Sequence, residues 1–355
     1  MTEDYFVFFA SCMPVYGRNG ITICDTQYGE IHWFPHDLQP LIESIDKRIP
    51  IIEMKKKFSD SDDGLEQFLD HFSNKKLGFY TKNPNVFPKL SMDWYHPSKV
   101  TNAIIDFDTC STHKIEHIID ALDHLLCPHI QIRYFQQVNK ESIIDQLISV
   151  KGSSVNSIDI VLTHPGNLSI DDLKTIYASY SQINSFTLFN AEDDRIVDDV
   201  PFLLSYMKRE ITNEKSCGLI TENHFSSNIK LFTESIDFNN CLNRKVSIDR
   251  TGAIKNCPSM ETSYGTVPTT NLLDVIDLVL NNPVTKIKKT EIQECDSCEY
   301  RMVCTDCRAY VDNPADIYSK PLKCGYNPVT TEWADWSTNT LKEKAIKFYQ
   351  LDNSN

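Results

Sequence analysis

The chain has 355 residues, of which 49 are acidic and 35 are basic, so its net charge at pH 7 is −14. This acidic excess argues against a nucleic-acid-binding protein, which needs surplus Lys and Arg for phosphate contacts. No stretch looks apolar enough to span a membrane, and the N-terminus lacks the basic start of a secretory signal. The sequence therefore predicts a cytoplasmic protein of two or three domains that binds neither nucleic acid nor membrane.

Residues 1–82 are predicted to form a small domain in which strands come first and helices follow. Aromatic and β-branched runs predict the strands, and apolar residues at helical spacing predict three helices before a short closing strand. These elements cover residues 5–10, 21–24, 30–34, 35–42, 51–58, 63–77 and 78–80. Residues 83–99, with three prolines and no clear period, are predicted to be a linker.

This order of strands and helices resembles the winged-helix-like precursor-recognition domain of peptide-maturation enzymes. The resemblance implies that an unmodified leader peptide binds as an added strand at the sheet edge beside the third helix. The alternative is a small α+β domain that serves only as packing. A DNA-binding winged helix fits less well, because Glu66 and Asp70 make the third helix acidic.

Residues 100–235 alternate between apolar runs typical of strands and longer segments with helical spacing. Such strand–helix repeats predict a parallel sheet, open or closed into part of a barrel, with ligands at the carboxyl ends of the strands. The predicted strands are residues 101–107, 130–135, 158–162, 186–189 and 217–220. The predicted helices are residues 113–126, 141–150, 170–180 and 200–206.

The first of these strands ends in a polar segment that could carry a site. Cys110, His113 and His117 have metal-ligand spacing, but the sequence shows no fourth ligand for them. We favour the interpretation that both histidines lie on the solvent side of a helix start and that Cys110 is a buried thiol. Asp106 and Asp108 are candidates for paired carboxylates. The chain has no glycine-rich phosphate loop, so nucleotide binding by such a loop is not expected.

Seven of the twelve cysteines fall in the segment 236–330. Two of them bracket a predicted hairpin that turns at Gly252. A disulfide framework suits a small secreted domain, so a thiolate metal site is the better prediction, with iron–sulfur clusters or zinc as its occupant. Arg301 and Arg308 could donate hydrogen bonds to cluster sulfide or could be surface charges, and we favour the surface interpretation. The candidate ligands are Cys241, Cys257, Cys295, Cys298, Cys304, Cys307 and Cys324.

The order of these cysteines resembles the SPASM domain, the iron–sulfur extension of radical-SAM peptide-modifying enzymes. Ten residues separate Cys241 from Gly252, four more precede Cys257, and two CxxC pairs and a final Cys324 follow. The stretches CEYRMVCTDCRAYVDNP and KPLKCGYNP resemble most closely the SPASM peptide maturase of grasp-with-spasm systems. Those systems combine an ATP-grasp ligase with a short precursor peptide.

The resemblance implies two auxiliary [4Fe–4S] clusters. The first would be held by Cys295, Cys298, Cys304 and Cys324. The second would be held by Cys241, Cys257 and Cys307, with Cys217 as a candidate for its fourth position. Two residues separate Cys304 from Cys307 where three is usual, which puts the geometry of the second cluster in doubt.

The chain departs from radical-SAM enzymes after its first two βα strands. Those enzymes carry CxxxCxxC after the first strand, whereas this chain has only Cys110 there. Their glycine-glycine-glutamate motif is replaced by residues 136–139, QQVN. We therefore predict an α/β fold with a degenerate partial (β/α) barrel over 100–235, between the N-terminal winged-helix-like α+β domain and the cysteine-rich SPASM domain. A helix and tail over 331–355 follow.

The resemblance implies an accessory protein in the maturation of a ribosomally synthesised peptide, without S-adenosylmethionine cleavage. Its partners would be the precursor peptide and the ATP-grasp ligase. One alternative is an iron–sulfur enzyme that modifies peptides through electron transfer or a Lewis-acid iron. Another is a structural zinc-binding scaffold. The sequence identifies no catalytic residue.

Overall fold

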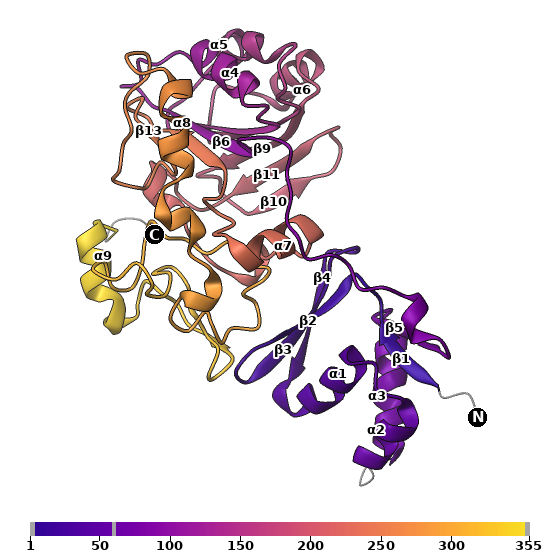
Figure 1. The fold of residues 1–355 in the computed structure, drawn as a ribbon. Helices are drawn as coiled ribbons and strands as arrows, with labels where there is room; N and C mark the ends of the chain where they lie inside the picture. Colours follow the sequence, from indigo (N-terminus) through magenta and orange to yellow (C-terminus); the bar gives the residue numbers. More distant parts are fainter. Residues whose placement is uncertain (1–3, 59–61, 352–355) are drawn as a thin grey trace.

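The computed structural model describes residues 4–58 and 62–351. Figure 1 shows an N-terminal α+β unit, coloured indigo to purple, beside a larger α/β body that carries the cysteine-rich loops and the C-terminus. Among the helices in the described ranges, none is long and apolar enough to cross a membrane.

The N-terminal unit contains two small antiparallel sheets, one ordered β2-β3-β4 and one made of β1 and β5. Its buried core includes Phe6, Ile21, Ile23, Phe34 and Phe72. Strand β2 was not predicted, and the first helix begins only at Gln39, with a proline in its first turn, where proline is tolerated. The elements are β1 (Tyr5–Phe8), β2 (Cys12–Tyr16), β3 (Gly20–Asp25), β4 (Glu30–Pro35), α1 (Gln39–Asp46), α2 (Ile51–Lys57), α3 (Asp62–Asn74) and β5 (Gly78–Thr81).

The larger body is built on an eight-stranded sheet of order β10-β11-β9-β8-β7-β6-β12-β13. Neighbouring strands run parallel from β11 to β12, and an antiparallel strand closes each edge. The strands are β6 (Asn102–Phe107), β7 (His129–Tyr134), β8 (Ser157–Thr163), β9 (Ile183–Phe189), β10 (Arg195–Val197), β11 (Leu203–Met207), β12 (Lys245–Ile248) and β13 (Ile254–Lys255). The predicted α/β class with a mostly parallel sheet is confirmed.

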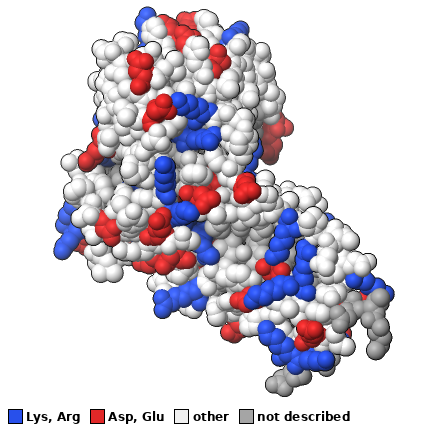
Figure 2. Space-filling model, viewed as in Figure 1, with Lys and Arg blue, Asp and Glu red and all other residues white. Residues whose placement is uncertain are grey.

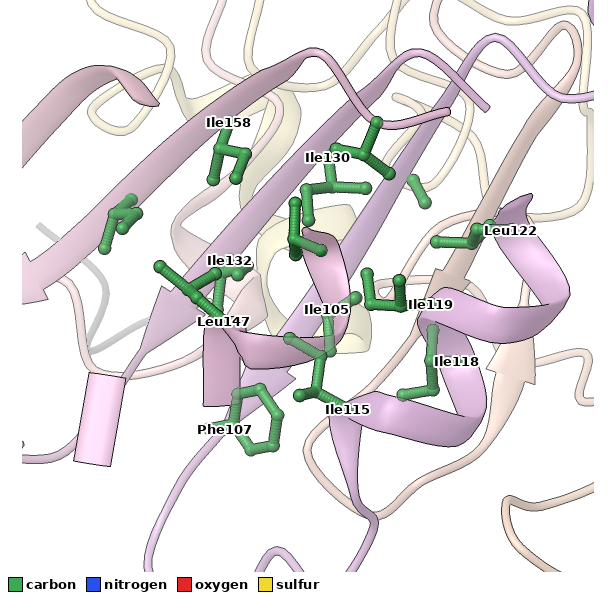
Figure 3. Packing of buried hydrophobic residues seen from close by; sticks show 14 of the residues in the cluster. Ile105, Phe107, Ile115, Ile118, Ile119, Leu122, Ile130, Ile132, Leu147 and Ile158 are labelled. Carbon is green, nitrogen blue, oxygen red and sulfur yellow. The ribbon is translucent and has the colours of Figure 1, made fainter. Parts of the chain in front are cut away.

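Helices α4 (Ile115–His124), α5 (Lys140–Gln146) and α6 (Ile170–Ser179) lie together on one side of this sheet (Figure 1). Figure 3 shows Ile105 and Ile130 of the strands facing Ile118, Ile119 and Leu122 of α4. Both the strands and the inner helix faces are rich in Ile and Leu, so this interface excludes water and fixes the sheet that positions the loops.

Two predictions about the last βα repeat are wrong. Residues 200–206 were predicted to be helical, but Leu203–Met207 is strand β11, paired in parallel with β9. Residues 217–220 were predicted to be a strand, but only Ile220 forms a bridge, to Cys324. Gly218 explains this difference, because its φ of +86° is incompatible with an extended strand.

The predicted hairpin around Gly252 is confirmed, and β12 extends the main sheet by pairing with β6. The predicted C-terminal helix is much shorter than expected, because α9 begins only at Glu343, and the tail after residue 351 lies outside the described residues. The remaining elements are α7 (Ile229–Asp237), α8 (Leu272–Leu280), β14 (Tyr326–Asn327), β15 (Glu332–Trp333) and α9 (Glu343–Tyr349).

Candidate metal centre

Four of the predicted ligands form a first thiol set, defined as Cys295, Cys298, Cys304 and Cys324. The Cys298 N–H donates to the Cys295 carbonyl at 3.2 Å, so the first CxxC pair is a tight turn. Burial raises the pKa of the Cys295 thiol most, and the neighbouring Asp306, Cys304, Cys298 and Cys324 raise it further. Because these thiols act on one another electrostatically, the four residues share one neighbourhood.

A second thiol set contains Cys217, Cys241, Cys257 and Cys307. Burial raises the pKa of Cys307 first, and the charges of Cys241, Cys257 and Cys217 raise it further. The pKa of Cys257 rises to about 12 through burial and then through Cys217 and Cys241. The structure thus brings Cys217, which spacing alone left as a distant candidate, to the three predicted ligands of the second cluster.

Gly218 gives independent geometric support for this grouping. A Cβ atom at Gly218 would lie 2.8 Å from the Cys307 sulfur, so the chain beside Cys217 passes directly against that thiol. Its φ of +86° lies in the left-handed region that glycine adopts readily. The glycine therefore allows both the bend and the close approach at the second thiol set.

All twelve cysteines lie in the described ranges, and their thiols are free of disulfides. Within residues 4–58 and 62–351, no three His, Cys, Asp or Glu side chains are arranged to hold a metal ion. The two thiol sets are therefore defined by mutual electrostatic effects, and not by a coordination geometry. Cys257 is buried and Cys217 is exposed, while the other six cysteines of the two sets are half-buried.

Buried lysines lie close to the first thiol set. Burial raises the pKa of Cys304 to about 12, and Lys289 opposes that rise. Burial also raises the pKa of Cys324, and Lys320 and Lys342 oppose it. Lys289 is only 2% exposed, and among the described residues it has no carboxylate partner within ion-pair distance. Lysines are seldom buried unless a negative charge accompanies them.

Lysines also lie close to the second thiol set. The Lys245 ammonium donates to the Cys241 sulfur at 3.8 Å. Lys323 is 1% exposed, donates to the Cys217 carbonyl at 2.9 Å and lies 4.7 Å from the ring centre of Tyr310. Burial and then Arg209 lower the pKa of Lys323 to about 8, whereas the Cys307 and Cys217 thiolates oppose this shift.

These surroundings fit an anionic metal centre. Four thiolates around a [4Fe–4S] cube, or around one zinc ion, leave a net charge of about −2. Such a charge would offset the burial of both Lys289 and Lys323 and would oppose the lowering of the Lys323 pKa. The charges are compatible with either occupant.

Arg308, predicted to be a surface charge, is instead buried, with 3% of its surface exposed. Its guanidinium donates to Asp306 at 2.8 Å and to the carbonyls of Ile317 and Ser319. The Asn239 amide also donates to Asp306, at 2.7 Å. These bonds fix the short segment between Cys304 and Cys307, which joins the two thiol sets.

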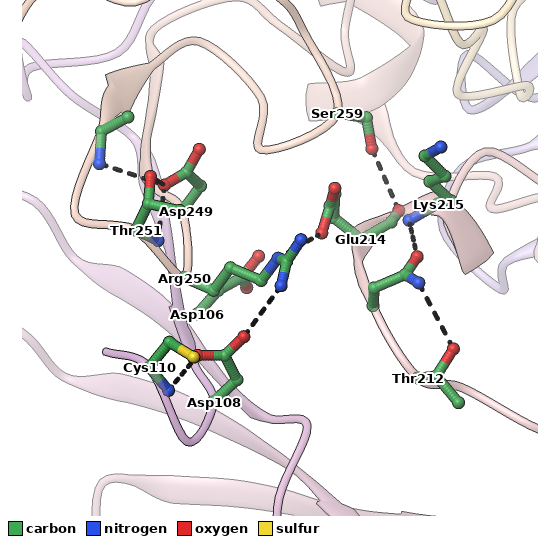
Figure 4. A network of polar contacts seen from close by, with 12 residues as sticks. Asp106, Asp108, Cys110, Thr212, Glu214, Lys215, Asp249, Arg250, Thr251 and Ser259 are labelled. Carbon is green, nitrogen blue, oxygen red and sulfur yellow. Dashed lines mark hydrogen bonds and ion pairs between the residues drawn. The ribbon is translucent and has the colours of Figure 1, made fainter. Parts of the chain in front are cut away.

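The polar segment after β6 forms ion pairs at the carboxyl end of the sheet (Figure 4). Asp106 is fully buried and accepts from Arg133 at 2.7 Å through both oxygens. Asp108 contacts Arg250 at 3.0 Å, and Arg250 lies 3.6 Å from Glu214. Asp108 and Arg250 meet because β6 and β12 are parallel neighbours. The two aspartates therefore have separate arginine partners and are not a carboxylate pair.

Two interpretations of the neighbouring residues are wrong. Cys110 was expected to be buried and is exposed. His113 was expected on the solvent side but is 5% exposed and stacks on Phe107 at 4.7 Å, because α4 begins only at Ile115. Both ring nitrogens of His113 lack hydrogen-bond partners among the described residues, whereas His117 is exposed as expected.

Burial lowers the pKa of His113, which makes the protein less stable in acid. Below the ordinary histidine pKa of about 6.5, the unfolded chain binds a proton that the folded chain does not. The contribution of His113 to the free energy of unfolding is therefore complete above about pH 6.5 and decreases as the pH falls below that value. Between pH 7.5 and 5.5, the free energy of unfolding of His113→Phe should fall by about 1 kcal/mol less than that of the wild type, as measured by urea unfolding. His117→Phe, on the exposed side of α4, should leave the pH dependence unchanged.

Comparisons with known proteins do not assign this centre to a family. Neither a scan against family models nor a search of curated proteins found a match to the chain. The function of this centre is therefore inferred from its residues and from the cysteine pattern.

Proposed function

We propose that the chain is an accessory protein in the maturation of a ribosomally synthesised peptide, similar to the SPASM peptide maturases of grasp-with-spasm systems. It would bind the precursor peptide, the partner ATP-grasp ligase or both, and would not cleave S-adenosylmethionine. The observation that carries this proposal is the gathering of eight cysteines into two thiol sets, each accompanied by buried lysines.

The first thiol set would hold one [4Fe–4S] cluster and the second set the other, with Cys217 as its fourth ligand. When bound, such clusters supply either rigid crosslinks between loops or an electron-transfer centre. The residues of this chain then keep the clusters away from water and balance their charge. Lys289 would do this at the first set, and Lys245 and Lys323 at the second.

The ion pairs beside β6 support a protein without S-adenosylmethionine chemistry. A radical-SAM enzyme carries three cysteines at this place, whereas here Asp108, Arg250 and Glu214 bridge the loops that leave β6 and β12. The consecutive order of β6, β7, β8 and β9, with helices along one side, is compatible with a degenerate partial barrel. We propose that such a barrel serves as the frame for the two thiol sets.

The outer edge of β4 is our candidate for the peptide-binding strand. The β2–β3 hairpin closes with the Gly17 N–H donating to the Gly20 carbonyl, which fixes the alternation of hydrogen bonds across the sheet. Along a strand, the N–H and C=O groups of successive residues point alternately to its two sides. The N–H and C=O groups of Ile31 and Trp33 therefore point away from β3. In the described residues β4 is the edge strand, so an extended peptide could pair with these groups.

Helix α3 lies close to β4, as in a winged-helix-like recognition domain. Phe34 of β4 packs against Phe72 of α3, with ring centres 5.3 Å apart. Figure 2 shows Lys and Arg side chains gathered over the N-terminal unit, although the whole chain is acidic. Residues 1–82 nevertheless contain 13 Asp and Glu against nine Lys and Arg, so this face does not define the charge of the bound peptide.

The metal content tests the two thiol sets. After strictly anaerobic purification we expect about eight iron and about eight acid-labile sulfide per chain, as two [4Fe–4S] clusters require. About two zinc without sulfide would instead favour the structural scaffold, and neither metal would contradict the assignment of both sets.

Peptide binding tests the proposed role. Synthetic fluorescent peptides from the short reading frames that flank the gene should bind, as measured by anisotropy. Ile31→Pro should weaken binding about tenfold, because it removes an outward N–H from the β4 edge while sparing the bonds to β3. Gln27→Ala, in the exposed β3–β4 turn, is the matched control. Failure to bind either these peptides or the neighbouring ATP-grasp ligase would contradict the proposal.

A further inference from the structure

The β2–β3 hairpin of the N-terminal unit contacts the loop that carries the first thiol set (Figure 1). The Arg18 N–H at the hairpin turn donates to the Ser297 carbonyl at 2.8 Å. The Arg301 guanidinium donates to the carbonyls of Tyr16, at 2.8 Å, and Cys298, at 2.7 Å. These hydrogen bonds join the turn of the hairpin to the CxxC turn that contains the proposed ligands Cys295 and Cys298.

Glu299, the residue after Cys298, occupies the centre of this contact. It is fully buried, and its carbonyl accepts from the Thr22 hydroxyl of β3 at 2.6 Å. Its carboxylate accepts from the Trp33 indole N–H of β4 at 3.1 Å and from the Tyr326 hydroxyl. Tyr326 lies two residues after Cys324, so Glu299 connects two ligand-bearing loops to two strands of the N-terminal sheet.

Two glycines allow this carboxyl group to lie against the hairpin. A Cβ atom at Gly17 would lie 2.6 Å from a Glu299 carboxylate oxygen. A Cβ atom at Gly20 would lie 2.6 Å from the other oxygen and 2.4 Å from the Trp33 indole nitrogen. No ordinary Cβ contact is so short. At Gly17 the added atom would also lie 2.7 Å from the Glu299 backbone nitrogen, so a larger residue there must push the hairpin away from Glu299, whereas at Gly20 the close atoms all belong to side chains.

An apolar contact reinforces the polar one. Val303, the residue before Cys304, is fully buried against Met13 and Val15 of β2 and Phe232 of α7. Residues 299–303 have no helix or strand of their own. They are held by the N-terminal sheet on one side and by Cys298 and Cys304 at their ends. Such an irregular segment is ordered only while its anchors hold it, because ordering costs about 1–2 kcal/mol per residue.

We infer that occupancy of the first thiol set controls the placement of the N-terminal sheet, and through it the β4 edge. A centre bound to Cys298, Cys304 and Cys324 fixes the loops that hold Glu299 and Tyr326, and these fix Trp33 on β4. Loss of that centre frees residues 299–303 and releases the hairpin. The coupling rests on the proposed centre in the first thiol set, and its regulatory meaning rests in addition on the proposed peptide binding at β4.

The N-terminal unit has a core of its own, which includes Phe6, Ile42, Leu69 and Phe72. Release of the hairpin should therefore loosen the contact between the units while helices α1 and α3 keep their protection. Hydrogen exchange distinguishes these two regions, because it reports local opening segment by segment.

The test is anaerobic hydrogen exchange with mass spectrometry on the full chain, with iron and sulfide measured on the same samples. Cys324→Ala, in the first thiol set, should speed exchange in residues 12–25 and 297–303 by at least about tenfold. Exchange in residues 39–58 and 64–74 should stay as in the wild type. Cys257→Ala, which alters only the second set, is the matched control and should leave residues 12–25 unchanged. Equal exchange in all three proteins, or equal loosening in both variants, would overturn the inference.

Gly17→Ala tests the coupling from the other side without altering any ligand. The added Cβ would lie 2.7 Å from the Glu299 backbone nitrogen and should force the hairpin from Glu299, so exchange in residues 12–25 should rise while iron stays at the wild-type level. Gln27→Ala, in the turn at the opposite end of β3, should change neither quantity. Wild-type exchange in Gly17→Ala would show that the hairpin contact does not hold the sheet. No peptide is used in these measurements, so failure of the proposed peptide binding would leave their results standing.

Discussion

Replacing Arg133 with methionine should lower the free energy of unfolding by about 3–5 kcal/mol, because Asp106 would stay buried without its partner. Asp106 has no exposed surface, and both of its oxygens accept from Arg133 at 2.7 Å. Burial lowers the pKa of Arg133, but Asp106 and then Cys217 and Cys257 more than reverse this shift, so the guanidinium stays charged. Urea unfolding under anaerobic conditions measures the loss.

The exposed ion pair in the same network supplies the control. The Arg250 side chain is 45% exposed and pairs with Asp108, so Arg250→Met should cost less than about 1 kcal/mol. The double variant Asp106→Leu with Arg133→Met should recover most of the stability, because it buries no unpaired charge. Equal losses in Arg133→Met and Arg250→Met would contradict the argument. Iron measured in each protein shows whether Arg133 also supports the second thiol set.

The sequence predicted those elements whose apolar pattern is long or flanked by clear turns. Helix α4 belongs to this group because its inward face carries Ile and Leu at helical spacing, and strand β6 belongs to it because it is a short, almost continuous apolar run. Four of the five residues of β11 were assigned wrongly to a helix, since a short apolar run fits either period and only pairing with β9 decides it. The pairing of β12 with β6 could not be predicted from the sequence either, because it joins residues far apart in the chain.

At the candidate site, the sequence supplied the residue types but few of the neighbours. Cys295 and Cys298 lie in one turn, and the prediction from the CxxC spacing that both bind one metal centre stays a prediction. No spacing rule could place Lys289 or Arg308 in the interior, since both look like surface residues until the fold gives them partners. The burial of His113 depended on the start of α4, which is among the features that sequence patterns locate least well.

Cys217 offers the sharpest test of the second thiol set, because its place there comes from the fold and not from the cysteine spacing. Burial and then the charges of Cys217 and Cys241 raise the pKa of Cys257 to about 12, and the backbone beside Cys217 lies against the Cys307 sulfur. A cluster that needs four thiolates should therefore be lost when this one is removed.

We expect Cys217→Ala to lower both iron and acid-labile sulfide from about eight to about four per chain. Cys257→Ala should have the same effect, because both residues belong to one set, and combining the two substitutions should lower the iron no further. The control is Cys110→Ala, since Cys110 is exposed at the end of β6 and belongs to neither set. If Cys217→Ala retained about eight iron while Cys257→Ala retained four, the second cluster would take its fourth ligand elsewhere.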